Sequence, residues 1–194
     1  TTISNYNSDN LQDFNRPFRH SQLTGLIDDT DDSILSNVTT VTLAKFVTPD
    51  TTKATAYTLS FDNPFFHPHD GHNSAAGGII ASTGFFINGN TTREYFFDDD
   101  GNGNLRIYFL VAGVRTYFDS LAGTVDYDNG EIKINPVQIT SVSNVDELIS
   151  TRFRLTVLPN SNDIVPVRNQ LLELDLTNTS VSGTVDATAT TGKG

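Results

Sequence analysis

Apolar residues in the first part of the chain recur at helical spacing. Within residues 8–27, Leu11, Phe14 and Phe18 follow one another at intervals of three and four, and Leu26 extends roughly the same stripe. Residues spaced this way share one face of a helix, so the pattern predicts one or two short amphipathic helices.

The chemistry around this stripe suggests where the helices begin and end. Pro17 is expected to separate two helices or to begin the second. The acidic stretch at residues 28–32 offers capping side chains and favourable charge to a short helical turn at Ser33 to Asn37. We expect helix to end there.

From Val38 onward the apolar positions alternate, which is typical of strands. Arg106 and Arg154 are among the charged residues at the intervening positions, so we expect antiparallel strands with one solvent-facing side. The clearest alternating sets are Tyr57, Leu59 and Phe61; Leu105, Ile107, Phe109 and Val111; and Phe153, Leu155 and Val157.

Turn signals divide the strands. Asp128-Asn129-Gly130 separates two apolar runs and predicts a hairpin with a tight primed turn, because Asn-Gly tolerates positive φ. Pro136 is expected at an edge or a bend, and one further strand is expected near Val181.

These patterns predict a mainly β fold, an antiparallel sheet or sandwich of roughly eight strands with a short N-terminal helical segment, which could also be classed as α+β. We expect a helical opening segment at 1–37, an antiparallel β domain at 38–181 and a flexible tail at 182–194. Together they would form one structural unit.

Composition narrows the possible partners. The net charge of −11 makes nucleic acid an improbable partner, since phosphate binding depends on Lys and Arg. No apolar run is long enough for a bilayer and no secretion leader opens the chain, so we expect no membrane association.

Cysteine is absent, which excludes disulfides and thiolate chemistry. Methionine is also absent, even at position 1, which suggests a fragment of a longer protein.

The sharpest candidate site is the run from Phe65 to His72, the histidine loop, where His67, His69 and His72 accompany Asp70. Imidazoles and carboxylates bind zinc and related metals, so a weak ion site is one interpretation. Pro68 and Gly71 instead favour a bent loop with partly exposed histidines, and we prefer that interpretation.

The second candidate is the acidic loop from Asp98 to Asn104. Asp98, Asp100 and Asn102 match the first half of a calcium-binding loop, but the twelfth position is Phe109 instead of glutamate. A solvated hairpin loop is the favoured interpretation, with weak calcium binding as the alternative.

The sequence offers no complete catalytic arrangement. It has no Gly-x-Ser-x-Gly elbow and no phosphate-binding loop, and the carboxylates Asp126 and Asp128 lie at a predicted turn. We therefore predict a protein that is not an enzyme, with no catalytic, cofactor-binding or metal-binding residues and no cofactor.

Several segments together resemble one family, and their order along the chain carries the resemblance. The C-terminal portion of the large baseplate wedge protein of T-even-type contractile-tailed phages, gene product six in that system, is similar in these segments. They are Phe18-Arg19-His20-Ser21, residues 27–37, residues 123–137, Ser161-Asn162-Asp163 and residues 171–181.

The resemblance implies an architectural role. It implies a wedge-subunit segment in the tail baseplate of the virion, assembled in the bacterial host cytoplasm. Its partners would be a second copy of itself, as a homodimer or a ring contact, and other baseplate wedge proteins. The family brings no catalytic residues, and the histidine loop and the acidic loop are not among its features.

Two other functions remain open from the sequence. A carbohydrate- or ligand-binding β-sandwich is suggested by the acidic loop and four aromatic residues: Phe65, Phe66, Tyr95 and Phe96. The absence of tryptophan weakens this reading. A metal-dependent hydrolase centred on the histidine loop is the less favoured alternative.

Overall fold

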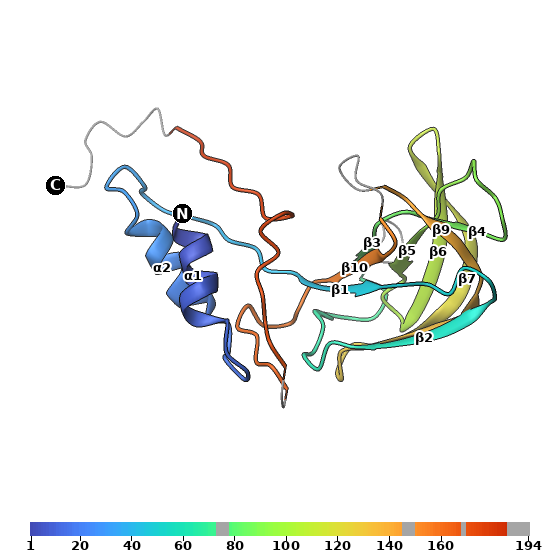
Figure 1. The fold of residues 1–194 in the computed structure, drawn as a ribbon, viewed down its shortest axis with the longest axis horizontal. Helices are drawn as coiled ribbons and strands as arrows, with labels where there is room; N and C mark the ends of the chain where they lie inside the picture. Colours follow the sequence, from blue (N-terminus) through green and yellow to red (C-terminus); the bar gives the residue numbers. More distant parts are fainter. Residues whose placement is uncertain (73–77, 145–149, 168–169, 186–194) are drawn as a thin grey trace. The chain divides into compact units, whose positions relative to one another are not determined.

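The computed structural model describes residues 1–72, 78–144, 150–167 and 170–185. The chain divides into two compact units. Unit 1 combines the N-terminal forty residues with the described part of the chain from Asn162 onward, and unit 2 comprises Val41–Ser161. Both are drawn in Figure 1.

Unit 1 contains the two helices, α1 (Thr2–Asn10) and α2 (His20–Asp28), and the C-terminal segment. Phe18 forms an antiparallel bridge with Ile164, and the Tyr6 ring packs edge-on against Phe18 at a centroid distance of 5.8 Å. The buried apolar side chains of this small core are Tyr6, Leu11, Phe18, Leu23 and Ile164.

The helical prediction is right in kind and shifted in position. Pro17 lies between the two helices as expected, but α1 begins at Thr2 and Leu11 already caps its end. Leu11 and Phe18 of the predicted stripe are buried, whereas Phe14 is 68% and Leu26 41% exposed, so the stripe is confirmed only in part. Tyr6, which the stripe did not include, completes the buried face.

Two other expectations in unit 1 are wrong. Ser33 to Asn37 forms no helix: the Asp31 carboxylate accepts the Ser33 N–H in a tight turn, and the Asn37 side chain donates back to Asp28. The segment around Val181 forms no strand within the described residues.

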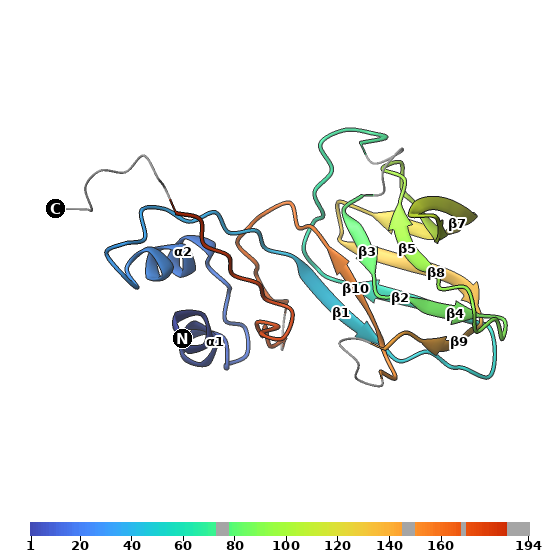
Figure 2. The same cartoon turned by 90° about the horizontal axis from the view of Figure 1, so that it is seen from above.

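Unit 2 carries all ten strands of the described chain and confirms the mainly β, antiparallel fold. Figure 2 shows these strands from above. The bounds are β1 (Leu43–Val47), β2 (Thr55–Ser60), β3 (Ile80–Ser82), β4 (Phe85–Ile87), β5 (Phe96–Asp99), β6 (Asn104–Val111), β7 (Val114–Asp126), β8 (Glu131–Val137), β9 (Ile139–Val142) and β10 (Phe153–Val157).

The strands form three sheets that share one core. The largest has the order β2-β8-β7-β6-β5, the second β1-β10-β3, and the smallest pairs β4 with β9. Side chains join the sheet edges: Asp99 accepts the Ile80 N–H across β5 and β3, and the Lys45 ammonium donates to the Ser60 carbonyl across β1 and β2. Side-chain hydrogen bonds therefore link the edges of the sheets, although each sheet is open and ends in two edge strands.

The core of unit 2 comes from the inward positions of the alternating strands. Phe85, Phe97 and Phe153 are fully buried and lie with centroids 4.6 to 6.0 Å apart. Leu105, Ile107, Leu155 and Val157, which the alternation placed on the apolar face, are all buried as well. The period-two pattern therefore identified the inner face of these strands correctly.

The predicted hairpin between β7 and β8 is present, although its turn is longer than expected. Asp126 pairs with Glu131, which leaves the four residues from Tyr127 to Gly130 in the loop. Only Gly130 of these four has positive φ, at 64°, so the loop is not a two-residue primed turn. Pro136 lies in β8 beyond its pairing with β7, as expected for a residue that cannot donate a ladder hydrogen bond.

The two units divide the chain differently from the predicted segments. The predicted boundary after residue 37 lies close to the boundary between the units at Thr40. Residues 162–181, which were expected within the β domain, pack with the helices in unit 1. Most of the predicted flexible tail, residues 186–194, lies outside the described residues.

Candidate functional site

The histidine loop follows β2 and packs on the hairpin that leads into β8. The His67 ring stacks on Tyr127 with a centroid distance of 4.2 Å and an interplanar angle of 8°. His72 packs edge-on against His67 at 5.0 Å, and His69 against His72 at 6.1 Å. The sequence cluster therefore becomes an aromatic stack built around a tyrosine.

Backbone carbonyls occupy one nitrogen of each imidazole. His67 Nε2 donates to the Gly101 carbonyl at 3.1 Å, His69 Nδ1 to the Asp70 carbonyl at 3.0 Å, and His72 Nδ1 to the His69 carbonyl at 3.0 Å. A protonated nitrogen that donates to a carbonyl cannot also coordinate a metal. These contacts hold the loop in a bent shape, as Pro68 and Gly71 suggested.

The described residues offer no metal centre at this loop. No group of three or more His, Cys, Asp or Glu side chains converges among them. Asp70 Oδ1 lies 3.7 Å from His67 Nε2, but the Asp70 side chain is 90% exposed. The hypothesis of a metal-dependent hydrolase therefore finds no set of metal ligands in the described part of the chain.

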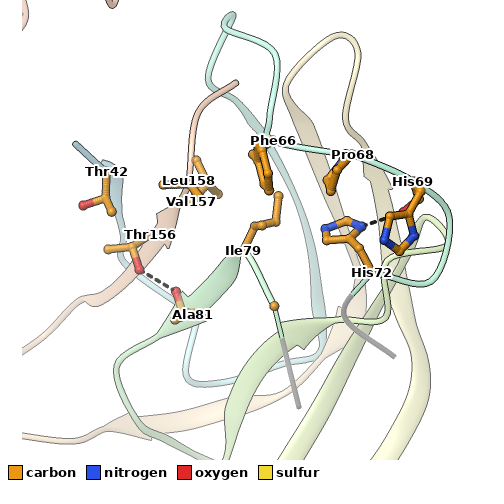
Figure 3. A pocket seen from close by; sticks show the side chains of 11 residues that line it. Thr42, Phe66, Pro68, His69, His72, Ile79, Ala81, Thr156, Val157 and Leu158 are labelled. Atoms are coloured by element: carbon orange, nitrogen blue, oxygen red, sulfur yellow. Dashed lines mark hydrogen bonds between the residues drawn. The ribbon is translucent and has the colours of Figure 1, made fainter. Parts of the chain in front are cut away.

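A shallow cavity of about 590 Å³ lies beside the loop (Figure 3). His69 and His72 line one side of it and Phe66 another, while Ala81 and Thr156 contribute from the paired strands β3 and β10. The Thr156 hydroxyl donates to the Ala81 carbonyl at 3.2 Å, so this polar group is already satisfied. The described residues that line the cavity are mainly apolar, and among them no nucleophile is paired with a base.

The acidic loop is a structural hairpin connection between β5 and β6. The Asp100 carboxylate accepts the N–H groups of Asn102 and Asn104 and the Asn104 side-chain amide, at 2.7 to 3.0 Å. Burial raises the pKa of Asp100, but these hydrogen bonds outweigh burial and bring the pKa below its ordinary 3.8. Asp100 therefore caps the turn, as the hairpin interpretation requires.

Asp98, the first residue of the calcium pattern, binds side chains of β6 and β7, whereas Asp100 binds the N–H groups of its own loop, so the two carboxylates serve different partners. Asp98 is 1% exposed and accepts Arg106 Nε at 2.9 Å, Arg115 Nη1 at 2.9 Å and the Tyr117 hydroxyl at 3.0 Å. Burial raises the pKa of Asp98, against the opposing effect of the two guanidinium groups. This carboxylate is enclosed by cations and is not available to calcium.

Asp99 faces the core of unit 2. Its Oδ1 accepts the Ile80 N–H at 3.1 Å and its Oδ2 accepts the Tyr127 hydroxyl at 2.8 Å. Burial raises the pKa of Tyr127 well above its ordinary 10.0, and the neighbouring Asp99 charge raises it further. Asp99 thus joins β3, β5 and the β7–β8 hairpin, and through Tyr127 it supports the histidine stack.

The polar network around Asp98 was missed at the sequence level. Arg106 was placed on a wet strand face, yet it is 6% exposed because its guanidinium lies under the Tyr117 ring, 4.2 Å from the centroid. The network could have been predicted from the charged and aromatic residues that occupy outward positions on adjacent strands. Such a prediction depends on knowing which strands are neighbours, which spacing alone does not reveal.

The aromatic residues proposed for a sugar platform are divided between the surface and the core. Phe65 is 2% and Tyr95 3% exposed, so neither can present a ring face to a ligand. Phe66 is 39% exposed, and Phe96 stacks on Tyr108 at 5.5 Å. The four rings do not make one platform.

Comparison with known proteins decides the affiliation of the N-terminal part. Residues 1–46 match the family model of the baseplate structural protein gp6, C-terminal domain III. Over these residues the chain is similar to the C-terminal part of gp6. The gp6 match covers both helices, the acidic stretch at 28–32 and most of β1, and it includes neither the histidine loop nor the acidic loop. No curated protein matches the chain with significance.

The match confirms the resemblance inferred from the sequence. Gp6 is described as a baseplate structural protein, so a structural role in the phage baseplate follows for this segment. No helix within the described residues is long and apolar enough to cross a membrane.

Proposed function

We propose that this chain is a non-catalytic structural segment of a phage tail baseplate that binds neighbouring protein subunits. Its partners would be other copies of itself, in a dimer or a ring, and the other proteins of the baseplate wedge. Its place would be the tail baseplate of the virion. The gp6 match supports the baseplate part of this proposal.

The observation that carries the proposal is the set of large apolar side chains that unit 1 leaves exposed, in a unit that contains residues 1–40 of the gp6 match. Such side chains are available to a partner, and the buried centre of a protein interface is enriched in apolar residues. The exposed residues include Phe14 (68%), Leu35 (49%), Val165 (55%) and Leu171 (50%).

A second observation concerns the backbone near the C-terminus. Residues 171–176 read Leu-Leu-Glu-Leu-Asp-Leu, an alternating sequence that favours a strand, yet they pair with no strand among the described residues. The Leu174 N–H is held by the buried Asn7 side chain at 2.8 Å, which fixes the segment against α1. A segment of this sequence, held in this way, is a candidate for pairing with a strand from a partner.

The apparent molar mass of the chain, measured by light scattering over a concentration series, tests the proposal. We expect the mass to rise with concentration and the association to weaken in the variants Phe14→Ser and Leu35→Ser. Leu121→Ser is the matched control, because Leu121 is equally exposed at 65% but lies in unit 2. A mass that stays monomeric up to the solubility limit, with no binding to other wedge proteins, would refute the proposal.

A further inference from the structure

The outward face of β5, β6 and β7 carries an ordered layer of arginine and aromatic side chains. Phe96 pairs with Tyr108, Tyr108 with Tyr117, and Leu110 with Arg115 in the sheet register. Their strand neighbours Phe97, Leu105 and Ile107 point into the core. We call the outward layer the arginine–tyrosine face; it comprises Phe96, Arg106, Tyr108, Arg115 and Tyr117.

Contacts within the arginine–tyrosine face hold its side chains in place. The Arg106 guanidinium lies 4.2 Å from the Tyr117 ring centroid, and the Arg115 guanidinium lies 4.6 Å from that of Tyr108. Both arginines also donate to Asp98 at 2.9 Å. Side chains ordered before binding lose little conformational entropy when a partner arrives, and Tyr and Arg are the residues most enriched in binding hot spots.

The charge of the arginine–tyrosine face is opposite to that of the whole chain. Two guanidinium groups surround the single carboxylate of Asp98, which leaves one positive charge in excess on a chain of net charge −11. The Arg115 side chain is 35% exposed, whereas Asp98 is 1% exposed. Arg115 can therefore pair with a second, external carboxylate through its remaining donors.

Unit 1 contains a segment with the complementary chemistry. The stretch at residues 28–32 holds four aspartates in five positions, and Asp29 and Asp32 are both exposed. Apolar side chains flank it on both sides, with Leu26 41% and Leu35 49% exposed. A segment of this kind offers carboxylates to arginine and apolar contacts to tyrosine rings.

We propose that the acidic stretch of one copy binds the arginine–tyrosine face of a second copy, an inference that rests on the proposed self-association. The external carboxylates of Asp29 and Asp32 pair with Arg115, while Leu26 or Leu35 covers the ring of Tyr108 or Tyr117. The contact joins two different surfaces, so it can be made once per copy in a ring or twice, reciprocally, in a two-fold dimer.

Charge reversal on each side of the contact provides the test. Sedimentation velocity of the full chain is measured for the wild type, Arg115→Glu and the double variant Asp29→Lys/Asp32→Lys, at low and high salt. The matched control is Asp70→Lys/Asp128→Lys, which changes the net charge by the same amount as the double variant, at exposed positions outside both surfaces. Circular dichroism of each variant verifies that it is folded.

We expect both reversals to raise the dissociation constant roughly tenfold or more and the control to change it less than about twofold. Mixing Arg115→Glu with Asp29→Lys/Asp32→Lys should restore association, because the reversed charges again attract. If Arg115→Glu does not fold, the double variant Asp29→Lys/Asp32→Lys still tests the contact. Its two residues are exposed, so their substitution should leave the fold intact.

Two outcomes are distinguishable. Wild-type association that neither reversal weakens would overturn this contact and leave the proposed function in place. A wild type that remains monomeric at every concentration and salt would overturn the proposed function, and this contact with it.

Discussion

At the scale of single residues, the adjacent acids Asp98, Asp99 and Asp100 have three different environments. Asp98 is enclosed by arginines, Asp99 is hydrogen bonded in the core, and Asp100 caps a turn. The sequence treated all three as a solvated loop and was right only for the last. The partners of the other two lie 7 to 28 residues away along the chain, beyond what local spacing can reveal.

A substitution at Tyr127 measures how much this buried network contributes to the free energy of unfolding. In Tyr127→Phe the Asp99 carboxylate loses the hydroxyl that donates to it at 2.8 Å. We expect the free energy of unfolding to fall by about 1–3 kcal/mol, the usual cost of leaving a buried acceptor without its donor. Chemical denaturation measures the change. Tyr108→Phe serves as the control and should be nearly neutral, so an equal loss in both variants would contradict the argument.

A single added Cβ atom at Gly130 tests how tightly the β7–β8 hairpin packs against its neighbours. A Cβ added there would lie 2.0 Å from the Asn63 carbonyl oxygen, and the residue has φ of 64°. Gly130→Ala should therefore destabilise the fold by more than the roughly 1–3 kcal/mol of backbone strain alone. Gly113→Ala is the matched control, since Gly113 has φ of 80° and no atom within 4 Å of its added Cβ. Thermal unfolding of both variants should show the larger loss for Gly130→Ala, and equal losses would exclude the carbonyl clash.

At the scale of elements, burial periodicity predicted the strands well and the helices less well. Strands β6 and β10 coincide with the alternating sets that the sequence identified, because each buries one face against a large core. Helix α1 packs on a small core through Tyr6 and Leu11, and two buried side chains give too little pattern to locate its ends. The sequence therefore predicts an element best where the surface it buries is largest.

An ion pair joins the start of α2 to the C-terminal segment, next to the backbone bridge between Phe18 and Ile164. Asp163 accepts Arg19 Nη1 and the His20 N–H, both at 2.9 Å. The Arg19 hydrogen bond, followed by that of His20, lowers the pKa of Asp163 below its ordinary 3.8. The stabilisation from a lowered carboxyl pKa is complete above the unfolded-state pKa, and it is lost as pH falls through the folded-state pKa.

Hydrogen exchange at the His20 amide can detect this contribution. In Asp163→Asn, exchange at pH 7 should be faster than in the wild type, since the charge that binds Arg19 is gone. At a pH below the folded-state pKa the two proteins should exchange at similar rates, because the wild-type carboxyl is then neutral. A difference that persists unchanged at low pH would mean that the charge of Asp163 does not matter.

At the scale of the whole molecule, the family match and the core belong to different parts of the chain. The gp6 match ends at residue 46, whereas the buried cluster of unit 2 runs from Val47 to Val157. The sequence pattern predicted one structural unit, with residues 38–181 in a single β domain. The structure assigns residues 162–185 to the helices, a long-range packing choice that spacing along the chain does not encode.

This division predicts that residues 41–161 fold without the rest of the chain. Every buried member of the large apolar cluster lies within that range, and all three sheets are complete in it. Far-UV circular dichroism and a cooperative thermal transition of the isolated fragment measure the outcome. The fragment 41–150 is the control, because it lacks β10, the central strand between β1 and β3, and should not fold. If 41–161 is unfolded while the full chain is stable, unit 1 supplies a necessary part of the β core, and the two units form one cooperative structure.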